Sequence, residues 1–186
     1  MPNDASLVGV GKPKVGGAVY IAPLGTTAPT DSTTALDEAF ELLGYISEDG
    51  VVISEERDSD NLVAWGGDTV RTLQSTYTET FAFTPIEVNP VVARAQYGDG
   101  NVTVTAGKMT ISHNSSQPAE KMIVIETVPN ASTTDRFFVP RAQLTEKGEQ
   151  TLNDTDPMGR ECTYTALPDE SGNTAYEFVA NASFTE

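Results

Sequence analysis

The chain has 186 residues and a formal net charge of −16, with hydrophobic residues at 38% and charged residues at 20%. This length supports one domain with its own core, and this composition excludes a membrane-embedded chain and a plainly disordered one. The acidic excess argues against a surface that grips nucleic acid, because phosphate binding needs clustered Lys and Arg. An acidic domain whose charge only keeps it in solution explains the composition equally well.

Cysteine usage and hydropathy indicate the compartment in which the protein is made. Cys162 is the only cysteine in the sequence, so an intramolecular disulfide cannot form. No apolar run is long enough for a secretory signal or a bilayer span. We therefore expect synthesis in the cytoplasm and no membrane partner.

The N-terminal part alternates short strands with polar segments. Residues 1–16 are rich in Gly and predict an extended N-terminal arm. Strands are expected at 17–23, within 40–46 and at 50–56, where apolar and β-branched residues gather. Residues 24–37 are rich in Pro and Thr and predict a polar loop.

Residues 57–67, RDSDNLVAWGG, predict a long acidic loop between two strands. The loop keeps three large apolar side chains, and these are Leu62, Val63 and Trp65, the only Trp of the chain. Apolar groups at a loop tip either fold back onto their own domain or dock onto a partner. The sequence alone leaves both interpretations open.

Residues 68–101 form the stretch around which the chain is organised. Its first half alternates with a period of two, which predicts a strand with one buried face. The other parity carries small polar side chains, most of them Thr. The apolar parity carries Leu73, Tyr77, Phe81 and Phe83.

A short helix follows this strand. Asn89 is a good N-cap, and Pro90 suits the first helical position, where its missing N–H is not needed. Gly98 stands where a helix commonly ends, and a tight turn over 98–101 leads into the next strand. No other stretch gives a convincing helix.

The C-terminal half predicts further strands at 102–111, 120–128 and 136–144. The run EKMIVIETV at 120–128 predicts a strand buried on both faces. A turn joins it to 136–144 as a hairpin, in which Pro140 indicates an edge or a bulge. Residues 145–157 predict a surface loop.

Two last strands, 159–167 and 174–184, are expected to form a final hairpin. The sequence contains no internal repeat and no stretch typical of a linker. Residues 1–186 therefore predict a single, mainly β domain with one short helix.

Residues with catalytic or metal-binding potential do not assemble into a recognisable site. His113 is the only His, which excludes zinc sites that need several His ligands. Cys162 could formally pair with His113, but it lies on a strand parity that looks buried, where Cys acts as a small hydrophobe. Asp154-x-Asp156-x-x-Gly159 lacks the later ligands of a calcium loop. We expect no enzyme, no metal and no cofactor.

Four stretches in this order carry a resemblance to a known family. They are GGAVYIAPLGTTAPTD, LGYISEDGVVISEERDSDNLVAWGGDTVRTL, TYTETFAFTPIEVNPVVARAQYGDGNVTV and KMIVIETVPNASTTDRFFVPRAQL. The chain resembles the major tail tube protein of long-tailed bacteriophages with non-contractile tails, over nearly its whole length.

The resemblance implies a β-sandwich or partial barrel with one short helix, whose strands join across subunits into a tube-forming β-barrel. Six copies would close a ring, and stacked rings would form the virion tail tube around a tape-measure protein. Tail terminator and tail-tip proteins are further implied partners, and DNA would pass through without specific binding. The chain would then be a structural protein made in the host cytoplasm.

Two groups of candidate residues follow from this resemblance. Besides the N-terminal arm and the C-terminal segment, candidates for ring-to-ring contacts lie in the acidic loop, with Trp65 as anchor: Arg57, Asp58, Asp60, Leu62, Val63 and Trp65. An acidic lumen repels phosphates at short range, which allows DNA to pass. Glu79 is a further acidic candidate, although it shares the parity of the aromatic side chains. The lumen-facing candidates are Glu56, Asp68, Glu126, Thr76, Thr78 and Thr80.

Two other functions remain compatible with the sequence. A stand-alone β-sandwich binding module, such as an adhesin or a carbohydrate-recognition domain, would use Trp65 with Tyr20 or Tyr97 as a sugar platform. Another virion structural protein, such as a tail terminator or a decoration protein, is the nearer alternative. Open-ended tubes, closed rings or monomers would distinguish these functions.

Overall fold

Strands dominate the protein. The computed structural model describes residues 3 and 5–184, and among these it places ten strands and one α-helix. The helix is α1 (Pro90–Tyr97), and 3₁₀ turns span Ala5–Leu7 and Asp99–Asn101. The strands are β1 (Val19–Pro23), β2 (Glu41–Leu42), β3 (Ile46–Val63), β4 (Thr69–Pro85), β5 (Val102–Thr105), β6 (Lys108–Ile111), β7 (Lys121–Asn130), β8 (Thr133–Lys147), β9 (Cys162–Ala166) and β10 (Tyr176–Asn181). The expected mainly β class with one short helix is confirmed.

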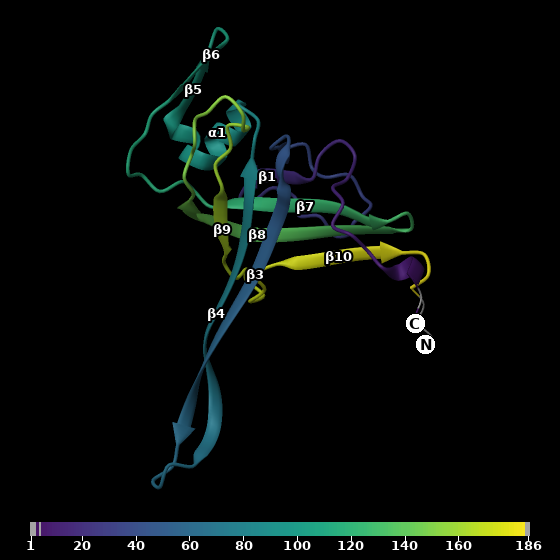
Figure 1. Ribbon diagram of the computed structural model, residues 1–186, viewed down its shortest axis with the longest axis vertical. Coiled ribbons are helices and arrows are strands. Elements are labelled where there is room, and N and C mark those ends of the chain that lie inside the picture. Colours follow the sequence, from purple (N-terminus) through teal and green to yellow (C-terminus); the bar gives the residue numbers. More distant parts are fainter. Residues whose placement is uncertain (1–2, 4, 185–186) are drawn as a thin grey trace.

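One large sheet folds over on itself. Its strand order is β2-β1-β7-β8-β9-β4-β3, with β10 also paired to β8. The long strand β8 belongs to both halves, because residues 133–138 pair with β7 and β10 while residues 142–147 pair with β9. In Figure 1, β7, β8 and β10 run across the direction of β3 and β4. The two halves thus face each other as in the expected sandwich or partial barrel.

The main core lies between these two halves and α1. Phe83 of β4 stacks on Tyr164 of β9, with ring centroids 5.6 Å apart. The Tyr164 hydroxyl donates to the Ala95 carbonyl at 3.0 Å and ties β9 to α1. The buried side chains of this core include Val19, Ile21, Ile123, Ile125, Val139, Phe81, Phe83, Tyr164, Val92 and Ala95.

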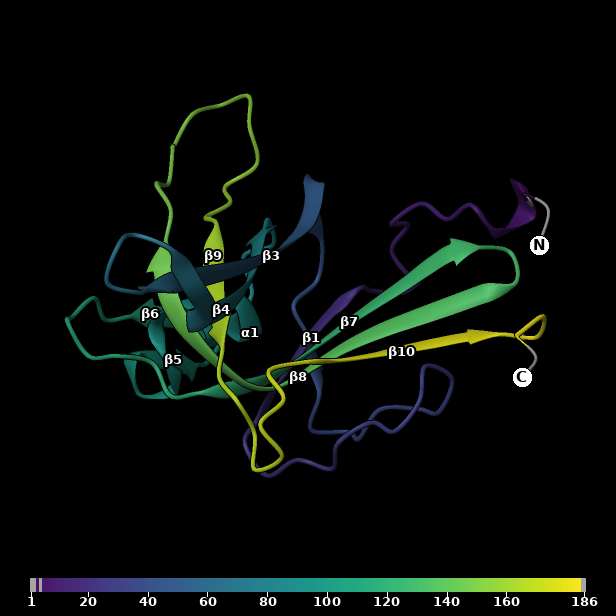
Figure 2. The ribbon, with the colours of Figure 1, turned by 90° about the horizontal axis from the view of Figure 1, so that it is seen from below.

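Strand β7 is buried on both faces, which confirms the prediction from its apolar sequence. Residues 122–126 are all buried. Alternate residues face the main core, and the others pack in a second cluster with Phe40 and Phe138. Figure 2 shows the long segment between β1 and β2 beside β8 and β10, where Leu36 contributes to the same cluster. The predicted loop at 24–37 therefore covers a face of the sheet.

The predicted helix is confirmed together with both of its ends. The Asn89 side-chain oxygen accepts the Val92 N–H at 2.8 Å, and Pro90 is the first helical residue. Gly98 ends the helix with φ 86°, a value that favours Gly, and donates its N–H to the Arg94 carbonyl at 2.8 Å.

Two strand predictions are wrong. The stretch 102–111 contains two strands, β5 and β6, which turn at Ala106 and Gly107. Ala106 takes φ 48°, a conformation rare for a residue with a side chain, so the sequence gives little sign of this turn. The final hairpin does not form, since β9 pairs with β4 and β8 whereas β10 pairs with β8.

One further prediction is confirmed, and one strand is shorter than predicted. The irregularity expected at Pro140 is present, because the β7–β8 register shifts between the pairs Lys121–Ala142 and Ile123–Val139. The strand expected within 40–46 is reduced to the two residues of β2.

Candidate interaction site

The β3–β4 hairpin projects far from the body of the protein (Figure 1). β9 pairs with β4 at residues 79–83, and within the described chain the hairpin continues beyond this contact as a two-stranded ribbon. We call residues 56–76 the projecting hairpin. At about 3.3 Å per residue, its β3 side extends roughly 30 Å.

The predicted loop at 57–67 is wrong. Residues 57–63 continue β3, and the turn is confined to residues 64–68, where the Ala64 N–H donates to the Asp68 carbonyl at 2.8 Å. A strand that has water on both faces lacks the alternation of apolar and polar residues by which strands are recognised. The polar sequence therefore indicated solvent on both sides, not the absence of a strand.

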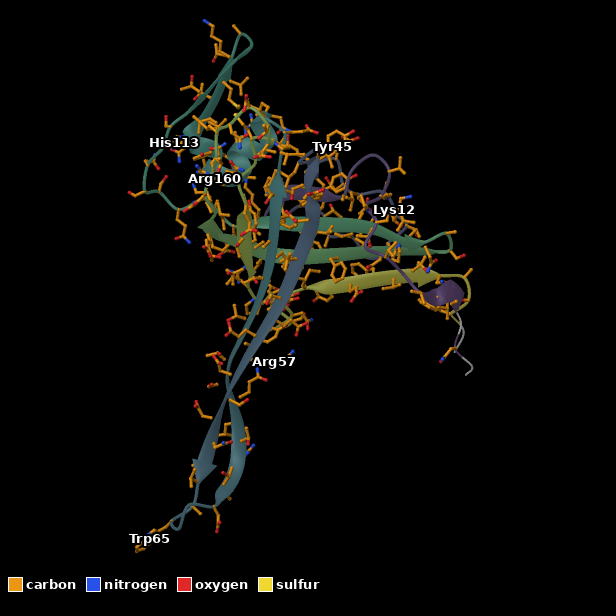
Figure 3. The ribbon with its side chains drawn as sticks, in the orientation of Figure 1. Lys12, Tyr45, Arg57, Trp65, His113 and Arg160 are labelled. Carbon is orange, nitrogen blue, oxygen red and sulfur yellow. The ribbon has the colours of Figure 1, made fainter. Side chains whose placement is uncertain are left out.

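The projecting hairpin leaves an unusual number of apolar side chains in solvent. Every residue from 52 to 76 is exposed, and Trp65 at the tip has a relative exposure of 108% (Figure 3). Folding back onto the domain is therefore excluded for the apolar groups of this segment. The exposed large apolar side chains of the projecting hairpin are Leu62, Val63, Trp65, Val70 and Leu73, and Val52 and Ile53 are exposed just before it in β3.

Beyond the strand pairing itself, side-chain contacts between the two strands of the ribbon are few and exposed. Thr76 donates to the Asp58 carboxylate at 2.9 Å, and Thr72 donates to the Asn61 side chain at 2.8 Å. The Arg57 guanidinium lies 4.4 Å from the centroid of the Tyr77 ring. Such cross-strand pairs stabilise by about 0.2–1 kcal/mol each, and an isolated two-stranded hairpin is marginal in water.

A β-bulge at Ser75 decides which side chains share a face. The register between β3 and β4 shifts between Asp58 and Ser59, which leaves Ser75 as an extra residue in β4. The extra residue reverses the alternation of β4 beyond it, and Leu73 faces the side opposite to Tyr77. The predicted common face of Leu73 and the core aromatic side chains is wrong.

On the side of the sheet that faces away from the core, the register brings most predicted lumen residues together. Glu56 pairs with Thr78, and residues directly opposite each other share a face. Phe81 points the other way, into the core. We name the outward side the threonine face: Ser54, Glu56, Asp58, Thr76, Thr78 and Thr80 of the hairpin, with Thr163 and Thr165 of β9. This set contains two carboxylates and no Lys or Arg.

The sequence matches the family model described as phage tail tube protein over residues 4–186. The chain belongs to the phage tail tube protein family. It is therefore a structural component of a virion tail and not an enzyme.

Solved structures from contractile injection systems resemble the chain at low sequence identity. One is the sheath–tube complex, in its extended state, of the PVC extracellular contractile injection system, at 10% identity and a TM-score of 0.47, covering 96% of this chain and 99% of that one. Another is the tube-terminating cap of the anti-feeding prophage, at 10% identity and a TM-score of 0.45, covering 98% and 100%. No curated protein matches the sequence.

Glu126 is removed from the lumen-facing candidates because it is buried inside the tail tube subunit. Its carboxylate accepts from the Arg136 side chain, which is itself buried, with the Nε contact at 2.9 Å. Lys14 of the N-terminal arm donates to the same carboxylate at 2.8 Å. Arg136 also donates to the Thr34 carbonyl at 2.9 Å, so this ion cluster fastens the 24–37 loop and the N-terminal arm to the sheet.

The two other acidic candidates lie in different environments. Asp68 lies in the exposed turn at the tip, beyond the threonine face. Glu79 is buried, and its carboxylate accepts from the Tyr77 hydroxyl at 3.3 Å and from Thr174. The parity that Glu79 shares with the aromatic side chains does place it on the buried side.

Cys162 and His113, the residues with nucleophilic or metal-binding potential, both pack against other side chains of the protein. Cys162 is buried in the main core, and burial raises the pKa of its thiol to about 11. His113 packs on Tyr97, with ring centroids 4.6 Å apart. In residues 3 and 5–184, no group of three or more His, Cys, Asp or Glu is placed to hold a metal ion. None of the helices in the described chain is long and apolar enough to cross a membrane.

The alternative sugar platform does not form. Trp65 stands at the tip of the projecting hairpin, whereas Tyr97 belongs to α1 at the opposite end of the molecule (Figures 1 and 3). Tyr20 lies in β1, which is also remote from the tip (Figure 1).

Proposed function

We propose that six copies of this chain close into a ring and that rings stack into a tail tube. The tube conducts the genome and holds a tape-measure protein in its lumen before ejection. The projecting hairpin is the observation that carries this proposal. A ribbon about 30 Å long, exposed on both faces and rich in apolar side chains, becomes stable when a neighbouring copy covers it.

The edge of the sheet supports closure into a ring. Among the described strands β3 pairs with β4 alone, which leaves its outer edge without a partner. Unpaired edges accept strands from other chains, and closing a barrel removes them. In the ring, the β8-β9-β4-β3 half of one copy continues into that of the next and forms the wall of the tube.

The threonine face suits the lumen of such a tube. Its opposite side is occupied by Phe81 and the rest of the core, so the threonine face must meet water or another molecule. Glu56 and Asp58 give it negative charge, and the set contains no cation. DNA is repelled at short range by such a surface and passes without specific binding.

The projecting hairpin makes the contacts between rings. The residues assigned to these contacts are Arg57, Asp60, Leu62, Val63 and Trp65, with Asp68 added because it lies in the tip turn. Asp58, whose carboxylate accepts from Thr76 on the threonine face, is assigned to the lumen instead. Tail terminator and tail-tip proteins cover the two ends of the stack, where the hairpin or its acceptor surface has no further copy.

Negative-stain electron microscopy at rising protein concentration, with light scattering at low concentration, tests the proposal. We expect rings and open-ended tubes of uniform width. A variant in which Asn-Gly replaces residues 59–75 keeps the body and closes the hairpin early. This variant should stop at single rings. Protein that stays monomeric at every concentration, or a shortened variant that forms normal tubes, would contradict the proposal.

A further inference from the structure

A cleft between β1 and α1 lies at the end of the molecule opposite to the tip of the projecting hairpin (Figure 1). Its volume is about 200 Å³. The lining includes apolar side chains of both elements, among them Ile21, Pro23, Val91 and Ala95. It also includes two cations, Arg94 and Lys121, and two carboxylates, Glu41 and Asp99. Lys121 is held by Asp99 at 2.5 Å, whereas Arg94 has no carboxylate partner among the ion pairs of the described residues.

The size and chemistry of this cleft suit an indole ring. A cavity of about 150 Å³ holds benzene, so the somewhat larger cleft has room for a bicyclic aromatic ring. The walls from Val91 and Ala95 provide apolar contact, and the Arg94 guanidinium can lie over an aromatic face. Trp65 is the only indole in the sequence, and it is fully exposed.

Charge at the tip also matches charge at the cleft. Asp68 in the tip turn offers a carboxylate for Arg94. Arg71, beside the tip and paired across the ribbon with Leu62, offers a cation for Glu41 at the rim of the cleft. Both surfaces thus carry charges of both signs.

Trp65 and the cleft of the same copy cannot meet, because they stand at opposite ends of the long axis of the molecule (Figures 1 and 3). The contact must therefore join two copies. A knob on one end that fits a pocket on the other end is a heterologous contact, which repeats without closing and generates open-ended assemblies.

We propose that Trp65 of one copy inserts into the β1–α1 cleft of a copy in the next ring. This proposal rests on the proposed function, because it names the acceptor surface for the projecting hairpin. The occupant is a second copy of this chain, and Trp65 is the anchor around which the neighbouring apolar side chains exclude water.

A second cleft, near the root of the projecting hairpin, suits the indole less well. Its volume is about 390 Å³, and it is lined in part by Glu55, Glu79 and Glu177. Glu55 is paired with Arg57 at 3.1 Å and Glu79 accepts from Tyr77, but Glu177 has no ion-pair partner among the described residues. An aromatic ring buried here would remove water from the Glu177 carboxylate without a compensating bond. This second cleft supplies the control for the test.

Disulfide cross-linking of assembled tubes tests the contact directly. The first double variant combines Ala64→Cys, beside Trp65, with Glu41→Cys at the rim of the β1–α1 cleft. The control combines Ala64→Cys with Glu177→Cys at the second cleft. Native Cys162 stays in both variants, because it is buried and its raised thiol pKa keeps it protonated at pH 8.

We expect the first double variant to give a ladder of covalent oligomers on a denaturing, non-reducing gel, and the control to give none. Tubes that form without a ladder from the first variant overturn the assigned acceptor and leave the proposed function standing. A wild-type chain that never assembles overturns the proposed function, and this contact with it.

Truncating Trp65 and filling the β1–α1 cleft should both weaken tube assembly. Trp65→Ala should raise the concentration at which tubes appear by about 30-fold or more, since truncating a central Trp anchor costs about 2 kcal/mol or more per contact. Val91→Trp, which fills the cleft, should do the same. Leu152→Ala removes an exposed apolar side chain from another surface and should change nothing.

Thermal unfolding of the unassembled variants distinguishes a loss of folding stability from a loss of the contact between copies. Trp65→Ala and Leu152→Ala should keep the wild-type Tm, because both side chains are exposed in the isolated copy. Normal tube formation by Val91→Trp with a wild-type Tm would overturn the cleft as the acceptor.

Discussion

Strand β4 runs through two regions of the molecule that differ in how far their side chains are buried. Its C-terminal part lies in the body, where Phe81 and Phe83 are nearly inaccessible to solvent. Its N-terminal part, residues 69–76, lies in the projecting hairpin, where every side chain is exposed. The body is stabilised by contacts within one copy. The hairpin keeps the same strand geometry without a core, which supports the proposal that its surface contacts another molecule.

The largest expected difference compares two apolar residues of this one strand. Phe81→Ala should lower the free energy of unfolding by about 3–5 kcal/mol, because it leaves a cavity in the main core. Leu73→Ala in the projecting hairpin should change it by less than about 0.5 kcal/mol. Urea unfolding of the unassembled protein measures both. A cost for Leu73→Ala close to that of Phe81→Ala would show that the hairpin packs within its own copy.

Charges give the next largest contrast, between a buried and an accessible ion pair. Glu126→Gln should cost about 3 kcal/mol, because it leaves the buried Arg136 guanidinium without its countercharge. Glu120→Gln removes the partner of Arg141, which lies 2.9 Å away and is partly exposed, and should cost less than about 1 kcal/mol. Denaturant unfolding at neutral pH measures the two variants. Equal costs would contradict the assigned role of the buried cluster.

Alkaline pH should distinguish a thiol in the body from one in the hairpin. The folded-state pKa of Cys162 is raised from 9.0 to about 11 by burial. The stability that this thiol contributes is therefore fully present below pH 9 and is lost as the pH rises toward 11, by up to about 1.4 kcal/mol per pH unit. Cys162→Ala should flatten the dependence of unfolding free energy on pH in this window.

A matched thiol in the hairpin sharpens this comparison. Ala64→Cys places a thiol on the exposed tip, where a thiol reagent at pH 8 should label it within minutes while native Cys162 stays unlabelled. Labelling of Cys162 at a comparable rate in the folded protein would contradict its place in the core.

The smallest expected effect concerns the lumen surface. Glu56→Lys together with Thr80→Lys should leave folding almost unchanged and give tubes a weak, salt-dependent affinity for DNA, with a Kd of about 10⁻⁴ to 10⁻⁶ M. Fluorescence anisotropy with short duplex DNA measures this binding. Glu149→Lys with Glu170→Lys, on loops outside the threonine face, is the matched control. Equal DNA binding by both pairs in intact tubes would argue against a lumen at the threonine face.

The features that the sequence predicts well are those decided by near neighbours. Asn89, Pro90 and Gly98 define both ends of α1 through contacts within four residues, and the apolar run of β7 demands burial on both faces. Pairing partners depend on distant parts of the chain. For that reason, the alternation near β10 could not reveal that it pairs with β8 instead of β9.

The predictions for the candidate residues also succeed where near neighbours decide the structure and fail where distant residues decide it. The Thr residues of β4 and Glu56 were placed together by a strict alternation that holds as far as Thr76. The bulge at Ser75 carries no sequence signal, and it reverses the alternation for Leu73. Glu126 has the appearance of a surface acid, and its burial depends on Arg136 lying opposite it in β8.

Hydrogen exchange of the projecting hairpin, followed by mass spectrometry in dilute protein and in assembled tubes, tests the central claim most directly. Amides of residues 56–76 should exchange quickly in the unassembled copy, because the ribbon is exposed on both faces and has no core, and should become protected in tubes. Amides of β7 should be protected in both states. Rapid exchange of the hairpin in fully formed tubes would contradict the claim that this surface is completed by a neighbouring copy.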